Sequence, residues 1–334
     1  MRSNNGVPCG GGGERRPDVS IVMSVYNGER HLREAVESIL GQTFTGFEFI
    51  IVDDASRDRS REIVRSYTDP RIVLLENERN QGITRSLNRA LGQARGAYLS
   101  RQDADDISEP ERLEVERDFL ERRPEVGLVG THAAFIDRAG RAFKVWRTPE
   151  THEEIVKGML YGNCFCHGSV MLRRSCLDAV GHYREEFRYT QDYDLWLRVS
   201  ERFATANIDR ILYRMRRTPG TISRNRHEEQ LDFHLLAREL ARERRRTGSD
   251  SLAALKGARI GEMLRTRYRL SEAAIAQFKA EMFLDKFSEA LLTGDYLSAV
   301  AFWAKAFTFE PRWGTMKALV RDIYRSVAPR VKAA

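Results

Sequence analysis

The sequence contains no apolar run near the ~20 residues that a membrane-spanning helix needs, although 42% of its 334 residues are apolar. Its first 17 residues lack the apolar core of a signal peptide and hold a run of glycines, so we expect a disordered tail over 1–17. Cysteine is scarce, and four such residues are typical of a protein from a reducing compartment. These absences predict a cytoplasmic protein.

Three of the cysteines lie near a histidine but lack the spacing of a zinc site. Cys164, Cys166, His167 and Cys176 follow one another closely in the chain. Structural zinc sites instead draw their ligands from two pairs, each with its own short spacing. The pattern favours cysteines that act as small buried hydrophobic residues on a strand.

Positive charge is concentrated in two segments, although the net charge is only +7. Residues 214–250 hold ten arginines against six acidic residues, and residues 312–334 hold six basic residues against one. The first segment lacks interleaved aromatic residues and any recognition motif, so we expect no nucleic-acid partner. In the second, apolar residues at helical spacing are compatible with a helix on the inner face of an anionic membrane, or with packing on the protein.

Short strands alternate with short helices along the first hundred residues. Strands are predicted at 19–25, 47–52, 71–75 and 97–100, because short apolar runs rich in β-branched residues are typical of strands buried on both faces. Helical spacing of apolar residues predicts a helix in each interval. This alternation predicts an α/β fold built on a doubly wound, mostly parallel sheet.

After the first hundred residues, predicted strands and helices no longer alternate regularly. A helix is predicted over 110–122, a strand at 126–130 and a strand at 164–173. A hairpin should turn at 137–140, and a helix should begin near Asp192. Thr151 and Glu154 have the spacing of a capping box that opens a further helix.

The chain is predicted to change character near residue 226. We assign an α/β domain to 18–226 and an α-helical C-terminal region to 227–334. Within that region, 294–311 resembles the second half of a tetratricopeptide repeat. One half-repeat predicts a helical hairpin that packs on the domain or on a partner protein, including a second copy of the chain.

Polar residues follow three of the predicted strands. They are Tyr26 and Asn27, Asp53 and Asp54, and the cluster Asp103, Asp105 and Asp106. Ligands of open parallel sheets bind beyond the carboxyl ends of the strands, so we expect these ends to share one crevice. In an extended segment, Asp103 and Asp105 project to the same side. A hard cation would offset their repulsion and hold a phosphate group.

Two other interpretations of the cluster were weighed. A calcium loop of the EF-hand type is rejected, because Ile107 and Ser108 fall where a ligand and a glycine are required. Asp106 and Ser108 fit caps of the following helix. The capping interpretation leaves Asp103 and Asp105 unexplained.

Five segments of the sequence resemble family 2 glycosyltransferases of the GT-A fold, and they occur in the order seen in that family. They are VSIVMSVYNGERHLREAVESILGQTF, FIIVDDAS, NQGITRSLNRAL, DADD and QDYDLWLR. The resemblance covers residues 18–226 and implies a GT-A, Rossmann-like sheet with flanking helices. It also implies a nucleotide-diphosphate-sugar donor and a divalent metal, Mn²⁺ or Mg²⁺.

The resemblance assigns residues to the donor. Tyr26, Asn27 and either Asp53 or Asp54 would lie against the nucleotide base and ribose. The segment that shapes the donor pocket contributes Asn80, Gly82 and Asn88, and we expect Asn88 mainly to support the loops.

The metal and the diphosphate would be held by a second group of residues. Asp103 would serve the ribose or the metal, and Asp105 the metal and the diphosphate. The run YRMRRTPGTISR resembles a segment that closes over the diphosphate, so Arg216, Arg217 or Arg224 could bind it.

The family places a catalytic carboxylate in an acidic pair on a later helix. Here the pair reads Gln191 and Asp192, so the resemblance assigns the catalytic base to Asp192. Trp196 would form an apolar wall that raises the pKa of Asp192. His167, Gln191 and Trp196 would line the acceptor side, and Asp194 would be a surface or secondary residue. A cap of the helix is the alternative role for Asp192.

The function implied by the resemblance is an inverting, metal-dependent transfer of a sugar to an acceptor hydroxyl. The acceptor would be a carbohydrate or a lipid-linked molecule in the biosynthesis of a polysaccharide, glycolipid or glycoprotein glycan. The alternative is a catalytically idle module that binds a nucleotide sugar and joins an assembly through its helical tail.

Overall fold

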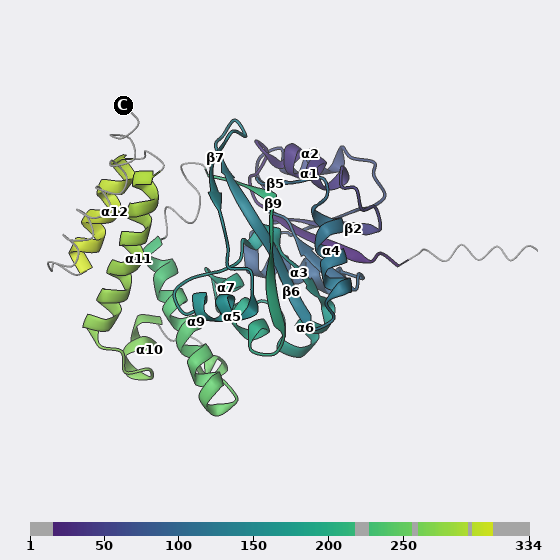
Figure 1. Cartoon of the computed structure of the whole chain (residues 1–334). Coiled ribbons are helices and arrows are strands. Elements are labelled where there is room, and N and C mark those ends of the chain that lie inside the picture. The colour runs from purple at the N-terminus through teal and green to yellow at the C-terminus, as the bar shows by residue number, and fades with distance from the viewer. Residues whose placement is uncertain (1–15, 218–226, 256–259, 293–295, 310–334) are drawn as a thin grey trace, which may run out of the picture.

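The structure is a computed structural model that describes residues 16–217, 227–255, 260–292 and 296–309. An α/β domain comes first in the chain, and helices follow it (Figure 1). Nine strands form one sheet, in the order β3-β2-β1-β4-β8-β6-β9-β5, with β7 paired to β6. The predicted α/β fold is confirmed.

The first four strands form the parallel half of the sheet. They are β1 (Val19–Val25), β2 (Phe47–Asp53), β3 (Ile72–Glu76) and β4 (Tyr98–Arg101). The central strand β1 pairs in parallel with β2 on one side and β4 on the other. Parallel neighbours require crossover helices, which are α1 (Leu32–Leu40), α2 (Ser60–Arg65) and α3 (Ile83–Gln93).

Side chains alternate between two cores along these strands. In β2, Phe49 and Ile51 belong to the core that also holds Leu32, Val36 and Ile39 of α1. Ile50 and Val52 point to the other face, into the core that holds Leu87 of α3. All seven residues of β2 are buried, as the unbroken apolar run predicts. The paired cores hold the carboxyl ends of β1, β2 and β4 in register.

The second half of the domain mixes strand directions. Its strands are β5 (Ile107–Ser108), β6 (Val126–Ile136), β7 (Ala142–Trp146), β8 (Met171–Arg173) and β9 (Ala204–Arg216). The strand β8 lies antiparallel to both β4 and β6, whereas β6 and β9 run parallel. Its helices are α4 (Arg112–Arg122), α5 (His152–Gly158), α6 (Arg174–Val180) and α7 (Gln191–Ser200).

Local signals in this half are confirmed with two exceptions. The turn over 137–140 joins β6 to β7, and the capping box of Thr151 and Glu154 opens α5. The strand predicted over 164–173 is only β8, because its first part forms the short 3-10 helix η1 (His167–Ser169). A second error concerns Ser108, which lies in β5 and donates to Gln102, while α4 begins four residues later without a side-chain cap.

Helices follow the domain. They are α9 (His227–Thr247), η2 (Leu252–Leu255), α10 (Ile260–Thr266), α11 (Glu272–Leu292) and α12 (Tyr296–Phe309). Figure 1 shows α11 and α12 side by side, far from β2, with α9 between them and the sheet. The predicted boundary near 226 lies outside the described residues, as do Gly294, Asp295 and Pro311 of the repeat-like segment.

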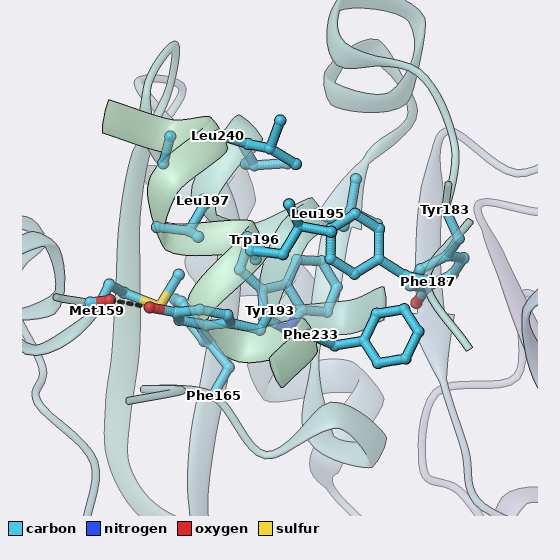
Figure 2. Packing of buried hydrophobic residues seen from close by; sticks show 14 of the residues in the cluster. Met159, Phe165, Tyr183, Phe187, Tyr193, Leu195, Trp196, Leu197, Phe233 and Leu240 are labelled. Carbon is cyan, nitrogen blue, oxygen red and sulfur yellow. Dashed lines mark hydrogen bonds between the residues drawn. The ribbon is translucent and has the colours of Figure 1, made fainter. Parts of the chain in front are cut away.

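Aromatic residues join α7 to the helices that follow. The Tyr193 ring stacks on His234 of α9 at 4.0 Å between centroids, and His234 stacks on Phe278 of α11 at 5.7 Å. Figure 2 shows the cluster around α7, in which the Tyr193 hydroxyl donates to the Met159 carbonyl. In the described part of the chain, no helix has both the length and the apolar character to cross a membrane.

Candidate active site

The carboxyl ends of β1, β2 and β4 meet at one edge of the sheet, as predicted. Val25 pairs with Asp53, and β4 flanks β1 on its other side. Asn27 joins the first two ends, because its amide donates to Ser56 Oγ and its side-chain oxygen accepts from Arg57 N at 2.8 Å. Asn27 therefore shapes the loops, whereas Tyr26 is 46% exposed and free to contact a ligand.

The adjacent residues Asp53 and Asp54 have different environments. Asp54 is buried and accepts from Asn77 Nδ2 at 2.6 Å and from the amides of Gln81 and Gly82 at 2.8 Å each. Its carboxylate therefore holds the loop that leads into α3. Asp53 pairs through one oxygen with Arg61 at 3.0 Å, and its buried Oδ1 has no partner among the described residues.

The loop before α3 carries the other donor-side residues. Gly82 has φ +86°, a conformation that disfavours other residues, and its amide is held by Asp54. Asn80 lies in the same loop with an exposed side chain. Asn88, on α3, donates to the Tyr183 carbonyl at 2.8 Å and accepts from the Tyr183 amide. This pairing matches the supporting role expected of Asn88.

The aspartate cluster divides into three environments. Asp103 forms an ion pair with the buried Arg101 at 2.6 Å. Asp105 is partly buried and has no hydrogen-bond or ion-pair partner among the described side chains, and its burial and the charge of Asp103 raise the pKa of Asp105 to about 6. Asp106 accepts from Arg216 N at 2.7 Å. Burial and the charges of Asp105 and Asp103 raise the pKa of Asp106 as well.

Asp106 therefore holds the end of β9 rather than capping a helix, which corrects the sequence-based interpretation. Tyr213 of β9 completes this contact, because its hydroxyl accepts from Asp103 N at 3.1 Å and also bonds Asp106. The arrangement leaves Asp105 and the outer face of Asp103 as the acidic groups open to a ligand.

The arginines expected at the diphosphate are held by protein groups or lie outside the described residues. The guanidinium of Arg216 is buried and donates to Glu34 and to the carbonyls of Asp105 and Asp137. Arg216 therefore shapes the Asp105 loop, and the expectation that it binds the diphosphate is wrong for this conformation. Arg217 is partly exposed and packs on the Phe135 ring at 4.5 Å. Arg224 lies outside the described residues.

Asp192 lies in the first turn of α7, where the helix dipole favours a carboxylate. Its Oδ2 accepts from Asn163 Nδ2 at 2.7 Å, and the residue is partly exposed. Gln191 beside it is 6% exposed. Asp194 is fully buried and pairs with Arg198 at 2.9 Å, so the expectation of a surface residue is wrong.

Of the three residues predicted on the acceptor side, His167 is partly exposed, whereas Gln191 and Trp196 are buried. Trp196 has no exposed surface, so it lies in the core behind the site and cannot form the expected wall against an acceptor. His167 is partly exposed, and its Nε2 lies 2.9 Å from the Tyr183 hydroxyl. Burial and the Arg101 charge lower the pKa of His167, so the ring is neutral at pH 7.

Four residues that hold the site together were not predicted from the sequence. Arg101 and Tyr213 hold Asp103, Asn163 holds Asp192, and Tyr183 bonds His167. An arginine at the end of a buried strand could have indicated Arg101, because a buried cation needs an acidic partner. The other three become visible only when distant segments pack together.

The three cysteines among the described residues are buried and unpaired, as predicted, but they lie in a loop and in α6 rather than on a strand. Burial raises the pKa of the Cys164 thiol to about 11 and that of Cys176 to about 12, so both remain protonated. Within the described ranges, the side chains of His132, Glu150 and Asp209 lie close enough together to hold an ion. They come from β6, β9 and the segment before α5, not from the aspartate cluster.

Comparisons with known proteins place this chain in a family. The sequence model described as Glycosyl transferase family 2 matches residues 20–181. The Bacillus subtilis protein named as glycosyltransferase EpsE is 36% identical, over 68% of this chain and 82% of its own. The amylovoran biosynthesis glycosyltransferase AmsE of Erwinia amylovora is 28% identical, over 78% of this chain and 97% of its own.

Solved structures share the fold. S. aureus TarS in complex with UDP-GlcNAc superposes with a TM-score of 0.56 at 17% identity, over 93% of this chain and 80% of that one. A mannosyltransferase from Pyrobaculum calidifontis, in complex with GDP-Man and Mn²⁺, superposes with a TM-score of 0.55 at 16% identity, over 94% and 81%.

The chain belongs to glycosyltransferase family 2, and its α/β domain has the GT-A fold. The enzyme class is therefore a glycosyltransferase.

Proposed function

We propose that this enzyme transfers a sugar from a nucleotide-diphosphate sugar to an acceptor hydroxyl, with inversion and with the help of Mn²⁺ or Mg²⁺. One observation carries the proposal: at the carboxyl edge of the sheet, Asp105 has no partner side chain among the described residues and lies in the same loop as Asp103, which Arg101 holds. Such a pair of carboxylates suits a divalent cation that would hold the diphosphate of a donor.

The residues present fit a divalent cation at the aspartate cluster. Asp105 is a carboxylate without a partner side chain among the described residues, and the neighbouring carboxylate of Asp103 adds to the effect of burial in raising its pKa. Hard cations prefer carboxylate oxygens, and a bound cation would remove the repulsion between Asp103 and Asp105. When bound, the ion neutralises negative charge on the departing diphosphate. The Mn²⁺ in the Pyrobaculum calidifontis structure supports this assignment.

The donor nucleotide is assigned to the edge beyond β1 and β2. Tyr26 offers an exposed ring on which a base can stack, and beside it lies Asp53, a buried carboxylate whose Oδ1 has no partner among the described residues. Asp54 and Gly82 fix the loop beside them, and Asn80 and Arg217 remain accessible to the donor. The UDP-GlcNAc and GDP-Man complexes of the two structural neighbours support a nucleotide-sugar donor.

Asp192 is proposed to take the proton of the acceptor hydroxyl. A hydroxyl is a weak nucleophile, so it needs a base within hydrogen-bond reach. Asn163 holds one oxygen of Asp192 and leaves the other for the acceptor. A single base opposite the leaving group suffices for one displacement with inversion. The names of AmsE and of the Escherichia coli O-antigen biosynthesis glycosyltransferase WbnJ support a carbohydrate or lipid-linked acceptor in polysaccharide biosynthesis.

The proposal is tested by donor binding and transfer with purified protein, Mn²⁺ and a panel of nucleotide sugars. Asp105→Ala is expected to abolish Mn²⁺-dependent stabilisation by the donor and to reduce transfer by at least about 100-fold. Asp118→Asn, on the surface of α4, is the matched control and should behave as the unmodified protein. Full activity of Asp105→Ala would refute the metal assignment. The anomeric configuration of the product, read by proton NMR, decides between inversion and retention.

A further inference from the structure

His167 is held in a fixed relation to the aspartate loop. It lies in η1, whose Gly168 packs so closely on Tyr213 that an added Cβ would lie 1.9 Å from the hydroxyl oxygen. That same hydroxyl accepts from Asp103 N at 3.1 Å. Arg112 adds a second tie, because it donates to the Gly168 carbonyl at 3.3 Å and to the Arg101 carbonyl at 3.1 Å. The turn that carries His167 cannot shift without moving Asp103.

Tyr183 fixes the orientation of the His167 ring. The Tyr183 hydroxyl lies 2.9 Å from His167 Nε2, and the two rings pack edge to face at 5.7 Å between centroids. Both rings also pack edge to face on the buried Trp196. Figure 2 shows Tyr183 at the margin of this aromatic cluster. The ring of His167 therefore has one packed orientation.

The backbone of Tyr183 is held from the donor side. Asn88 of α3 bonds both the amide and the carbonyl of Tyr183. The N-terminus of α3 is in turn the loop that Asp54 anchors through Gly82. A continuous set of hydrogen bonds thus leads from the predicted donor pocket through α3 and Tyr183 to His167.

The chemistry of this pair selects one tautomer. A phenol hydroxyl is a strong donor and a weak acceptor, so the favourable bond runs from Tyr183 to an unprotonated Nε2. The neutral ring then carries its proton on Nδ1. Nδ1 has no hydrogen-bond partner among the described residues, and it is not among the buried polar atoms that lack one. It is therefore open to a ligand as an N–H donor.

We infer that Tyr183 is a positioning residue that holds His167 as the Nδ1–H tautomer, so that His167 donates a hydrogen bond to a sugar hydroxyl between the aspartate loop and Asp192. This inference rests on the proposed function, since the ligand is a sugar of the donor or of the acceptor. The donor sugar and the acceptor sugar both present hydroxyl groups that could accept this hydrogen bond. Measurement of the KM of each substrate distinguishes between them.

The first test reads the tautomer directly and needs no activity. Histidine ¹⁵N shifts of the full-length protein at pH 7 distinguish a protonated ring nitrogen from a bare one, and His167→Gln assigns the His167 signals among seven histidines. Tyr183→Phe keeps the ring that packs on Trp196 and removes only the hydroxyl. We expect a single Nδ1–H form in the unmodified protein and a mixture in Tyr183→Phe. An Nε2–H form in the unmodified protein, or identical shifts in both proteins, overturns the positioning role.

The second test is a double-mutant cycle in the transfer assay. Tyr183→Phe should lower kcat/KM about tenfold, the loss expected for one oriented hydrogen bond, with nucleoside diphosphate affinity unchanged. A rise in the KM of the donor sugar assigns the hydroxyl to the donor, and a rise in the KM of the acceptor assigns it to the acceptor. The double variant Tyr183→Phe/His167→Gln should be no worse than His167→Gln alone, because Tyr183 acts through His167. Additive losses would refute the inference.

Tyr193→Phe is the matched control. It removes another buried phenol of the same cluster, whose hydroxyl donates to the Met159 carbonyl and does not contact His167. We expect it to lower stability and to leave the His167 tautomer and the KM values unchanged. If the unmodified protein neither binds a donor nor transfers a sugar, the proposed function fails and the sugar ligand with it. The tautomer measurement separates that failure from failure of the positioning role.

Discussion

Asp54 and Asp105 are both carboxylates at the carboxyl edge of the sheet, but their partners differ. Asp54 accepts three hydrogen bonds from the loop before α3 and is saturated. Asp105 has no such partner among the described residues, and its pKa is raised. Because an unpartnered carboxylate next to another is unfavourable without a cation, Asp105 is best explained by ligand binding. The distinction between supporting and binding residues therefore lies in their hydrogen bonds.

The raised pKa of Asp105 predicts a pH-dependent stability of the metal-free protein. A carboxyl whose pKa is raised by folding destabilises the folded state once it ionises, so stability falls as pH rises from about 4 through about 6. Asp105→Asn removes this charge and should raise the free energy of unfolding at pH 7 by about 1–3 kcal/mol relative to the unmodified protein. The difference should shrink towards pH 4, as read by thermal unfolding in EDTA. A difference that does not vary with pH would contradict the assignment.

Substitution of Asp192 separates a base from a helix cap. Asp192→Asn retains the shape of the side chain and its acceptance from Asn163, but it removes the basic oxygen. We expect transfer to fall by about 10²–10⁴-fold, the range for loss of a general base, with donor binding kept. Calorimetric titration of the donor with Mn²⁺ is the control measurement. Loss of binding together with transfer would show that Asp192 serves the fold instead.

At the scale of elements, the segment between α6 and α7 is held from three sides. Arg198 of α7 donates to the carbonyls of Val180, Gly181 and His182. On the side of α3, Thr84 donates to the Phe187 carbonyl at 3.0 Å. The C-terminal helices supply the third contact, because Asp250 pairs with Arg184 of this segment at 2.7 Å. The helices after α7 therefore brace the segment that carries Tyr183.

Removal of the Asp250 charge should loosen this brace. Arg244 also binds Asp250 through Nη1, and its Nε and Nη2 donate to the two carboxylate oxygens of Glu201 at the end of α7. Asp250→Asn leaves two guanidinium groups facing a neutral amide, and we expect the free energy of unfolding to fall by about 1–3 kcal/mol. Transfer should fall more than donor binding does, because the braced segment lies beside α7 and not beside β2.

The matched control for this substitution is Glu228→Gln. It breaks the solvent-exposed pair of Glu228 with Lys305, whose side chains are 49% and 55% exposed. Exposed pairs contribute about 0.2–1 kcal/mol, so stability and transfer should be nearly unchanged. Equal effects of the two substitutions in urea unfolding would contradict a bracing role for Asp250.

At the scale of the whole molecule, positive charge is uneven along the chain. Residues 312–334 carry six basic residues against one acidic residue. A segment of this kind, with apolar residues at helical spacing, should bind anionic bilayers. Deletion of 312–334 is expected to abolish co-sedimentation with vesicles that contain phosphatidylserine, while donor binding stays unchanged. Co-sedimentation that survives the deletion, or that is equal with neutral vesicles, would refute the membrane contact.

The local sequence pattern was sufficient to predict the helices and strands and the acidic residues at the strand ends. Buried parallel strands need unbroken apolar runs, amphipathic helices need helical spacing, and a turn or capping box is encoded in adjacent residues. The prediction was wrong where distant contacts decide the outcome. Residues His167–Ser169 form a 3-10 helix instead of the predicted strand, because Gly168 packs on Tyr213 of β9. Trp196 is buried because the rings of Phe165, His167 and Tyr183 pack against it.

The sequence by itself determined the α/β class, the family and the acidic loop, because each depends on residues that are close in the chain. Only the tertiary structure decided which of these residues are available. Arg216 is occupied by Glu34 and three backbone carbonyls, Asp54 by the loop before α3, and Asp105 by no described side chain. Availability depends on hydrogen bonds between segments far apart in sequence, and such bonds form only when the chain has folded.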